Sequence, residues 1–458
     1  MPRLFGTDGV RGVANQEPLT PELAFQLGRI GAVLLREKRG AGSRGRLIVG
    51  RDTRLSGPML EAALAAGVSS AGAECVLVGV MPTPAVAFLT RALDADGGVV
   101  ISASHNPYED NGIKFFAPTG MKLSDELEEE IEDRLASLES LPRPVGQGVG
   151  TVRAHVGAEA AYEAFVFGTV PGVRLDGMRI VVDCAHGATY RLAPRILRRL
   201  GAEVVTIGAR PTGRNINHHV GALFPEALQR RVRKEGAHVG LAFDGDGDRL
   251  ISVDEAGEVR DGDFLLALFA RDLHRSGRLP SLSVVTTLMA NVGLEISLKE
   301  AGIRMVRTPV GDRYVLEEML RLGAVLGGEQ SGHIIFLEHS TAGDGIISAL
   351  QLLRLIQETR QPLSVLAGCM RKSPQRLINV AVRAKPPLED LPRLSVRLKE
   401  IENAMDGRGR VLVRYSGTEP LARVMVEGQD EATVAARPRL ASPMRFSSSI
   451  TPPSTAGS

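Results

Sequence analysis

Short apolar runs alternate with amphipathic helical patterns along this chain, and one arrangement of them occurs three times. Each copy contains an apolar strand, a helix, and a second apolar strand that begins with glycine. The strand, helix and strand of the copies span 46–52, 59–70 and 72–80; 179–185, 193–200 and 201–208; and 283–290, 292–301 and 302–311. Alternating strands and helices indicate βαβ units, and continuously apolar strands fit sheets covered on both faces.

The repetition predicts an α/β protein with three related domains in tandem, although repeated units of a single sheet would give a similar pattern. Separate domains are favoured because each third of the chain carries its own polar loop. After them, strand patterns at 376–384, 410–416 and 422–428 and a helix pattern near 391–405 predict a smaller C-terminal α+β domain. The expected domains are 1–153, 154–255, 256–370 and 371–430, followed by a Pro/Ser-rich, irregular tail at 431–458.

Composition narrows the class of protein without identifying it. The 458 residues carry 55 basic and 53 acidic side chains, and the net charge of +2 gives no reason to expect nucleic acid or a membrane as the main partner. Three scattered cysteines do not suit a disulfide framework or a zinc site. The N-terminus lacks a signal-peptide pattern and no long apolar run is present, so a cytoplasmic setting is the default expectation.

The strongest single motif is LAFDGDGDRLISVDEAGE, in which Asp244, Asp246 and Asp248 alternate with glycine. Alternate side chains of an extended loop point the same way, and glycine lets the backbone wrap closely. The three carboxylates would then surround one hard cation, with Mg²⁺ preferred if phosphate completes its ligands. Clustered carboxylates repel one another, so a cation is the natural way to stabilise them.

Two other interpretations of this motif stay open at this point. Asp244, Asp246, Asp248 and Glu255 fit four positions of an EF-hand, but Arg249 stands where that loop needs glycine. The residues that follow also alternate as a strand rather than a helix. A solvated hairpin turn without any metal is the second alternative.

A second motif, GGVVISASHNPYEDNGIKFF, places Ser104 in a loop after an apolar strand, with His105 and Lys114 nearby. A serine hydroxyl is a weak nucleophile unless a base or cation activates it. If phosphorylated, Ser104 would need cationic neighbours. A plain Asn-Pro turn with an adjacent histidine explains the same residues equally well.

Further polar loops follow other strands. In GGEQSGH, Glu329 and Ser331 offer acceptors for hydroxyl or amine groups, whereas His333 suits a ligand contact and a structural role equally. In RVLVRYSGTEPLARVMVEG, a turn around Gly417 is flanked by the phosphate-binding candidates Arg414, Ser416, Thr418 and Arg423. A polar hairpin tip is the alternative there. Arg11, Asp312 and Arg313 lie in smaller glycine-containing loops that plain turns also explain.

These motifs, in this order, resemble those of the α-D-phosphohexomutases. SASHNP resembles the family's phosphoserine loop, DGDGDR its metal loop, GEQSGH its sugar-binding loop and RYSGTEP its phosphate-binding loop. The resemblance runs from FGTDGVRG near the start to about Gly428. FGTDGVRG, GRNINHHVG, VGDRYV and the pair Gln330-Ser331 resemble the members that act on glucosamine phosphates.

The resemblance implies four domains around a central cleft and a role for each motif. The transferable phosphate would be carried by Ser104, and one Mg²⁺ per chain would be held by a phosphoserine oxygen and by Asp244, Asp246 and Asp248. The implied catalytic residues are Ser104, Lys114, Arg249 and Arg11. The implied substrate-binding residues are Glu329, Ser331, His333, Arg414, Ser416, Gly417, Thr418 and Arg423.

The implied reaction interconverts glucosamine 6-phosphate and glucosamine 1-phosphate on the route to UDP-N-acetylglucosamine. Glucosamine 1,6-bisphosphate would be both intermediate and primer, an activating kinase or autophosphorylation would load Ser104, and a homodimer is a further expectation. A family member acting on mannose or glucose phosphates, a metal-dependent phosphatase, and a non-catalytic Ca²⁺-binding or sugar-phosphate-binding protein are the alternatives. One departure concerns the family's last helix, where Pro438 and Pro443 interrupt the pattern and predict less cover for the fourth domain.

Overall fold

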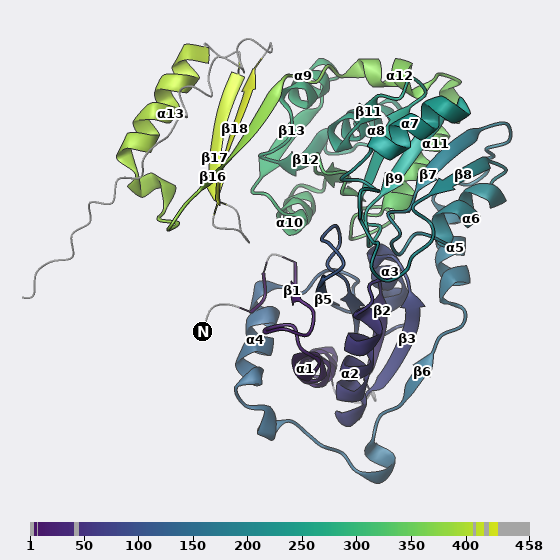
Figure 1. The fold of residues 1–458 in the computed structure, drawn as a ribbon, viewed down its shortest axis with the longest axis vertical. Coiled ribbons are helices and arrows are strands. Elements are labelled where there is room, and N and C mark those ends of the chain that lie inside the picture. The colour runs from purple at the N-terminus through teal and green to yellow at the C-terminus, as the bar shows by residue number, and fades with distance from the viewer. Residues whose placement is uncertain (1–3, 7, 41–44, 406–408, 416–420, 429–458) are drawn as a thin grey trace, which may run out of the picture. The chain divides into compact units, whose positions relative to one another are not determined.

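The computed structural model describes residues 4–6, 8–40, 45–405, 409–415 and 421–428, which fall into two compact units (Figure 1). The N-terminal unit comprises residues 1–371 and the C-terminal unit residues 372–458. The tail expected at 431–458 lies outside the described residues, as do both of its prolines that bear on the last helix. Among the described residues, no helix combines the length and apolar character needed to cross a membrane.

The first α/β domain of the N-terminal unit is a sheet with helices on both faces. Its strands are β1 (Val10–Val13), β2 (Arg46–Arg51), β3 (Glu74–Val80), β4 (Gly97–Ile101), β5 (Asp110–Phe116) and β6 (Val152–Ala154). Its helical segments are α1 (Pro21–Arg39), α2 (Gly57–Ser70), α3 (Thr83–Ala92), α4 (Asp125–Leu135), η1 (Leu138–Ser140) and η2 (Gly146–Gly148). On β2, Leu47 and Val49 pack in the core that contains α1 and α2, whereas Ile48 packs in the core that contains α3. Both faces are therefore covered, which is why β2 is apolar throughout.

The second and third domains of this unit are built in the same way. The second contains β7 (Arg179–Asp183), β8 (Glu203–Ile207), β9 (Val239–Phe243), β10 (Leu250–Asp254), β11 (Val259–Arg260), α5 (Ala158–Gly168), α6 (Leu192–Arg199) and α7 (Glu226–Glu235). The third contains β12 (Ser283–Thr287), β13 (Arg304–Thr308), β14 (Leu326–Gly328), β15 (Ile334–Phe336), α8 (Gly262–Arg275), α9 (Val292–Glu300), α10 (Asp312–Leu322), α11 (Gly345–Thr359), α12 (Leu363–Leu366) and η3 (Ala367–Cys369). The strand predicted at 302–311 is shorter than expected, because Gly302 has a φ of 72° and Pro309 follows its last residue.

The three sheets share one strand motif in the same order. The orders β5-β4-β2-β3, β10-β9-β7-β8 and β15-β14-β12-β13 each contain three parallel strands and an antiparallel fourth. The prediction of three related α/β domains is therefore confirmed. The loop between the third and fourth strand has the same topological position in each domain. We call these loops the serine loop (102–109), the acidic loop (244–249) and the glutamate loop (329–333).

The C-terminal unit is a small α+β domain, as predicted. Its elements are β16 (Gln375–Ala381), η4 (Leu388–Asp390), α13 (Pro392–Met405), β17 (Gly409–Tyr415) and β18 (Leu421–Gly428). The strands pair antiparallel in the order β16-β18-β17. Ile401 and Met405 of α13 pack against Val411 and Val426 of the sheet, which gives this unit its own apolar core.

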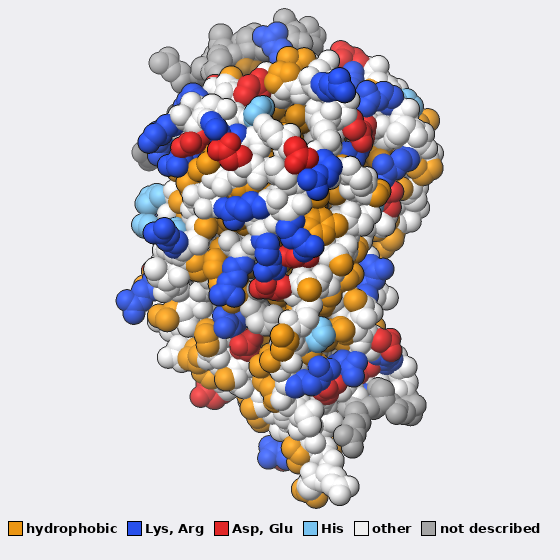
Figure 2. Space-filling view, turned by 90° about the vertical axis from the view of Figure 1, so that its right-hand side faces the viewer, with side chains coloured by type: hydrophobic (Ala, Val, Ile, Leu, Met, Phe, Trp, Pro, Cys, Tyr) orange, Lys and Arg blue, Asp and Glu red, His pale blue; other side chains and the backbone are white. Residues whose placement is uncertain are grey.

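Charged side chains of both signs are interspersed over the face of the molecule shown in Figure 2. At α6, Arg195 lies 2.7 Å from Glu159, and both side chains are partly exposed. Exposed pairs of this kind contribute little stability. Their mixture of signs matches the near-zero net charge of the chain.

The contact between α1 and α2 generates a prediction about stability. A Cβ on Gly67 would lie 2.0 Å from the backbone oxygen of Phe25, so Gly67→Ala forces two helix backbones apart. We expect a loss of roughly 1–3 kcal/mol in the free energy of unfolding. Gly168→Ala, in α5, is the matched control because no atom lies within 4 Å of its added Cβ, and alanine favours helix. Equal denaturant midpoints for the two variants would contradict this account.

Candidate functional site

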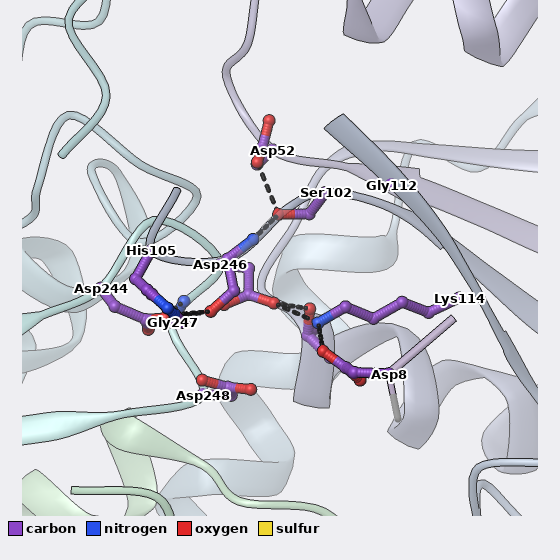
Figure 3. Close-up of polar contacts among 12 residues, drawn as sticks. Asp8, Asp52, Ser102, His105, Gly112, Lys114, Asp244, Asp246, Gly247 and Asp248 are labelled. Atoms are coloured by element: carbon purple, nitrogen blue, oxygen red, sulfur yellow. Dashed lines mark hydrogen bonds and ion pairs between the residues drawn. The ribbon is translucent and has the colours of Figure 1, made fainter. Parts of the chain in front are cut away.

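The serine loop and the acidic loop bring their side chains together in one site (Figure 3), and the glutamate loop borders it. The Ser104 hydroxyl of the serine loop donates a 2.6 Å hydrogen bond to Asp244 Oδ2 of the acidic loop. The acidic loop in turn pairs with the glutamate loop through a backbone bridge between Arg249 and His333. Residues far apart in the sequence are therefore neighbours because each occupies the same position in its own domain.

The acidic loop brings its carboxylates together in a tight turn. Asp244, Asp246 and Asp248 each offer an oxygen, and these oxygens lie within 4.8 Å of one another. The prediction that the loop is extended is wrong: Asp244 Oδ1 accepts hydrogen bonds from the backbone N–H groups of Gly247 and Arg249 at 3.1 and 3.2 Å. Gly247 has a φ of 74°, a conformation that glycine adopts without strain. The turn, rather than alternation along a strand, directs the carboxylates to one place.

Burial and mutual repulsion make this cluster a poor place for uncompensated charge. Burial first, and then the charges of Asp248 and Asp246, raise the pKa of Asp244 well above its ordinary value. Burial and Asp246 likewise raise the pKa of Asp248. Burial would also raise the pKa of Asp246, but the Lys114 ammonium and the hydrogen bonds that Asp246 accepts hold it below its usual range.

The cluster fits a hard divalent cation. Asp246 Oδ1 and Asp248 Oδ1 are buried and have no hydrogen-bond partner among the described residues. The donor set is entirely carboxylate oxygen, which suits Mg²⁺ or Ca²⁺ rather than a softer metal. The EF-hand alternative is wrong, because strand β10 and not a helix follows Arg249. The solvated-hairpin alternative is wrong as well, since Asp244 and Asp246 are each only 1% exposed.

The serine loop is clamped from two domains. Ser104 has a φ of 50°, which is costly for a residue other than glycine and requires support from its surroundings. Its carbonyl oxygen accepts hydrogen bonds from Arg54 Nη2 at 3.0 Å and from Asn217 Nδ2 of the second domain at 2.9 Å. Gly245 also packs here, because a Cβ on it would lie 2.4 Å from the same oxygen. The backbone of Ser104 is therefore fixed against the acidic loop.

Buried polar side chains of the first domain support the backbone of the serine loop. Arg54 is fully buried and its Nε lies 2.8 Å from Asp52 Oδ2. Ser102 donates a 2.5 Å hydrogen bond to the same carboxylate oxygen and accepts one from the backbone N–H of Ser104 at 3.0 Å. Each polar group of the chain Arg54–Asp52–Ser102 thus has a partner, as buried groups require.

His105 is close to Ser104 but poorly suited to be its base. Its Nδ1 lies 3.3 Å from Ser104 Oγ. Burial, followed by the charges of Arg249 and Arg11, lowers the pKa of His105 to about 3. A base this weak has little tendency to remove the proton of the Ser104 hydroxyl at neutral pH. Activation of Ser104 through a histidine pair is therefore disfavoured, and cationic stabilisation is favoured.

Lys114 and Arg249 supply positive charge to the site. Lys114 Nζ lies 3.1 Å from Asp246 Oδ2 and 2.8 Å from Asp8 Oδ2. Burial alone would lower the pKa of Lys114, but Asp246 and Asp8 raise it, so the side chain is an ammonium. The Arg249 side chain lies beside Asp248, with Nε 3.8 Å from Oδ1. Arg11 forms an ion pair with Asp8, which places its charge next to Lys114.

The glutamate loop presents one acceptor pair and one buried histidine. Ser331 Oγ donates to Glu329 Oε2 at 3.3 Å, and Gly311 N–H donates to Glu329 Oε1 at 3.2 Å. His333 is 3% exposed, and its Nε2 accepts a 3.2 Å hydrogen bond from the backbone N–H of Gly343. The same nitrogen lies 3.3 Å from Asp312 Oδ2, and the buried Nδ1 has no hydrogen-bond partner among the described residues, so the ligand-binding and structural interpretations of His333 both stay predictions.

The phosphate-binding candidates belong to the C-terminal unit. Arg414 of β17 and Arg423 of β18 lie directly opposite each other in the antiparallel pair, so their side chains leave the same face of the sheet. The other three candidates, Ser416, Gly417 and Thr418, lie outside the described residues.

Sequence reasoning missed four residues that support the site: Asp8, Arg54, Thr83 and Asn217. Thr83, for example, donates a 2.7 Å hydrogen bond to Asp246 Oδ2 across the domain boundary. Arg54 and Thr83 shortly follow the carboxyl ends of β2 and β3, where ligand sites of α/β sheets gather, and this position is a usable signal. Asp8 and Asn217 lie inside noted motifs, but no spacing assigns them a partner.

Comparison with known proteins identifies the parts of the chain. Family models match in order: phosphoglucomutase/phosphomannomutase alpha/beta/alpha domain I at residues 2–141, domain II at 165–257, domain III at 261–373 and the C-terminal domain at 377–438. A phosphoglucosamine mutase of Desulforudis audaxviator is 57% identical over 432 residues, which are 94% of this chain and 95% of that protein. One of Symbiobacterium thermophilum is 55% identical and covers 95% and 96%.

Solved structures agree with these matches. A phosphoglucomutase/phosphomannomutase family protein from Burkholderia thailandensis has a TM-score of 0.78 and 26% identity, and the match covers 95% of each chain. A putative phosphomannomutase from Thermus thermophilus has a TM-score of 0.73 over 95% of this chain and 97% of that one, at 24% identity. The matched segments, their order and the equivalent loops together place this chain in the phosphoglucomutase/phosphomannomutase family.

Proposed function

We propose that this chain interconverts glucosamine 6-phosphate and glucosamine 1-phosphate, as the names of its relatives from Desulforudis audaxviator and Symbiobacterium thermophilum suggest. The observation that carries the proposal is the 2.6 Å contact between the Ser104 hydroxyl and a buried carboxylate of the acidic loop. A serine held against a cation site is placed to carry a phosphoryl group, because the cation offsets the negative charge.

The proposed reaction has two phosphoryl transfers. In the first, the bond between phosphorus and Ser104 Oγ breaks while a bond to the C1 oxygen of glucosamine 6-phosphate forms, and the proton of the C1 hydroxyl passes to Ser104 Oγ. The resulting 1,6-bisphosphate turns around in the site. In the second, the bond between phosphorus and the C6 oxygen breaks, Ser104 Oγ takes the phosphoryl group back, and the proton of the Ser104 hydroxyl passes to the C6 oxygen. Glucosamine 1-phosphate leaves, and no net phosphate is consumed.

Mg²⁺ would be held by Asp244, Asp246 and Asp248 together with an oxygen of the phosphoserine. When bound, it supplies positive charge to the transferring phosphoryl group and the serine oxygen. The buried oxygens Asp246 Oδ1 and Asp248 Oδ1, which lack hydrogen-bond partners among the described residues, support this assignment. Glucosamine 1,6-bisphosphate as primer remains part of the proposal.

Cationic side chains would stabilise the phosphoryl group from the other side. The neighbouring carboxylates raise the pKa of Lys114, so it suits stabilisation of the charge on the phosphoryl group better than proton transfer. Arg249 and Arg11 would add charge from the acidic loop and from the first loop of the chain. Phosphoryl transfer depends mainly on such positioning and charge.

The remaining candidates would bind the sugar and its second phosphate. Glu329 and Ser331 would accept or donate hydrogen bonds to sugar hydroxyl or amino groups. Arg414 and Arg423, with Ser416, Gly417 and Thr418, would hold the phosphate that is not reacting. A kinase or autophosphorylation that loads Ser104, a homodimer and a cytoplasmic location stay predictions.

Removing the phosphate carrier tests the central role of Ser104. Ser104→Ala should lower conversion of glucosamine 6-phosphate by about 1000-fold or more, because the covalent route is lost. Ser124→Ala is the matched control, since Ser124 is exposed and its side chain makes no cap hydrogen bond. A coupled turnover assay with glucosamine, glucose and mannose 6-phosphates measures both the role and the preferred sugar. Turnover of the Ser104 variant near the control value would remove this serine from the mechanism.

The acidic cluster predicts opposite effects on stability and metal binding. Asp244→Asn keeps an acceptor for the two backbone N–H groups but removes one of three repelling charges. Without Mg²⁺, we expect its melting temperature to rise by roughly 2–4 °C, the shift that about 1 kcal/mol produces. With Mg²⁺, the wild type should gain stability and the variant should not. A variant that is less stable without metal would contradict the repulsion.

The same cluster predicts how stability depends on pH. The folded-state pKa values of Asp244 and Asp248 are raised, so their stabilising contribution is complete below the ordinary value of 3.8 and is lost as pH rises through the raised values. The folded-state pKa of Asp246 is lowered instead, so the stabilising contribution of Asp246 is already complete above pH 3.8. As pH rises above 3.8 and through the raised pKa values of Asp244 and Asp248, stabilisation by Mg²⁺ in thermal melts should therefore grow, since binding needs deprotonated carboxylates. A flat profile would count against the cluster as the cation site.

Comparing KM with kcat tests whether the two arginines of the C-terminal unit bind phosphate. Arg414→Ala or Arg423→Ala should raise KM about 10- to 100-fold, the effect of losing a charged hydrogen bond, and should change kcat much less. Arg383→Ala, an exposed arginine of the same unit, is the control. An unchanged KM in both variants would remove them from phosphate binding.

A further inference from the structure

A mostly buried lysine that the proposed reaction does not use connects the first and third domains. Lys122 Nζ lies 2.5 Å from Asp8 Oδ1 and 2.6 Å from Asp312 Oδ2, the first residue of α10. Its side chain is 17% exposed. Burial alone would lower the pKa of Lys122, but Asp312 and Asp8 raise it well above its ordinary value, so the group is a cation. Thr341 of the third domain reinforces the contact with a 2.8 Å hydrogen bond to the Gly120 carbonyl, two residues before Lys122.

Asp8 pairs with both Lys122 and Lys114 and so connects Lys122 to the site. Its Oδ1 pairs with Lys122, while its Oδ2 lies 2.8 Å from Lys114 Nζ. Lys114 then lies 3.1 Å from Asp246, as Figure 3 shows. The result is a chain of alternating charges that runs from Asp312 in the third domain, through the first domain, to the acidic loop of the second.

Stability is a weak explanation for such a chain. A mostly buried ion pair pays desolvation that its attraction barely offsets, and apolar residues of similar volume often serve equally well. A chain of charges does, however, fix positions, because each ammonium has two carboxylates at defined distances. The fixed end here is Lys114, the cation beside the acidic cluster.

We propose that Lys122 and Asp8 are positioning residues that hold the Lys114 ammonium in its reactive place, and that they do so only while the third domain supplies Asp312. The inference rests on the proposed function of Lys114. Among the described residues, the ion pairs of Lys122 are with Asp8 and Asp312, and of these two Asp8 is the one that also pairs with Lys114, so the effect of Lys122 on the Lys114 ammonium passes through Asp8. Docking of the domain that carries the glutamate loop is thereby coupled to the charge beside Ser104.

Kinetics of charge-removing and charge-keeping variants test this coupling. Lys122→Met should lower kcat about 10- to 100-fold, the effect of displacing a reacting group by about 1 Å, and should change KM by less than about threefold. Lys122→Arg keeps the charge and should restore most of the loss. Lys38→Met, which breaks an exposed lysine pair with Glu130, is the matched control and should behave as the wild type. Thermal melts of each variant accompany the kinetics.

A double-mutant cycle separates positioning from simple stabilisation. Asp8→Asn should lower kcat as well, and Asp8→Asn combined with Lys122→Met should be no worse than Asp8→Asn alone, because the two act in series. A normal kcat in Lys122→Met at a temperature where it is folded, or additive losses in the double variant, would overturn the proposal. The ratios are measured on whichever hexose 6-phosphate the wild type converts. Failure of the wild type on glucosamine 6-phosphate therefore counts against the proposed function alone.

Discussion

Crowding of like charges is the constraint on which the site depends. Three carboxylates are buried within reach of one another, and a serine hydroxyl donates a hydrogen bond to one of them. Burial and repulsion raise the pKa of Asp244, while Lys114 keeps Asp246 ionised. Neither protonation nor a single lysine satisfies the whole cluster, whereas a divalent cation would. A phosphoryl group on Ser104 would add negative charge at the same place and would increase the need for that cation.

Repetition of one strand motif explains how distant residues reach this place. The serine, acidic and glutamate loops each connect the third and fourth strands of their motif, so three similar domains present three different chemistries from one topological position. Close approaches then fix them: Gly245 leaves room for the Ser104 carbonyl, and Asn217 binds that carbonyl from the second domain. The same strand motif is thus used three times, and its connecting loop carries different residues in each domain.

The sequence predicts the elements and the motifs well because their signals are local. Continuous apolar strands, glycine-led second strands and the alternation of Asp with Gly all lie within short segments. The ion pairs between distant residues could not be predicted from the sequence, since Lys122 lies 114 residues from Asp8 and 190 from Asp312. The shape of the acidic loop was also missed, because hydrogen bonds from Gly247 and Arg249 to Asp244 turn a segment whose pattern suggests an extended one. Tertiary contacts decide such features, and no spacing reports them.

The most direct measurement is anomalous diffraction from crystals of the full chain, phosphorylated on Ser104 and grown with Mn²⁺ in place of Mg²⁺. The expected result is a peak bonded to carboxylate oxygens of Asp244, Asp246 and Asp248 and to one oxygen of the phosphoserine, at oxygen distances typical of a hard divalent ion. A peak elsewhere, with these carboxylates protonated or paired only with lysine and arginine, would contradict the claim that the cluster exists to hold a cation beside Ser104.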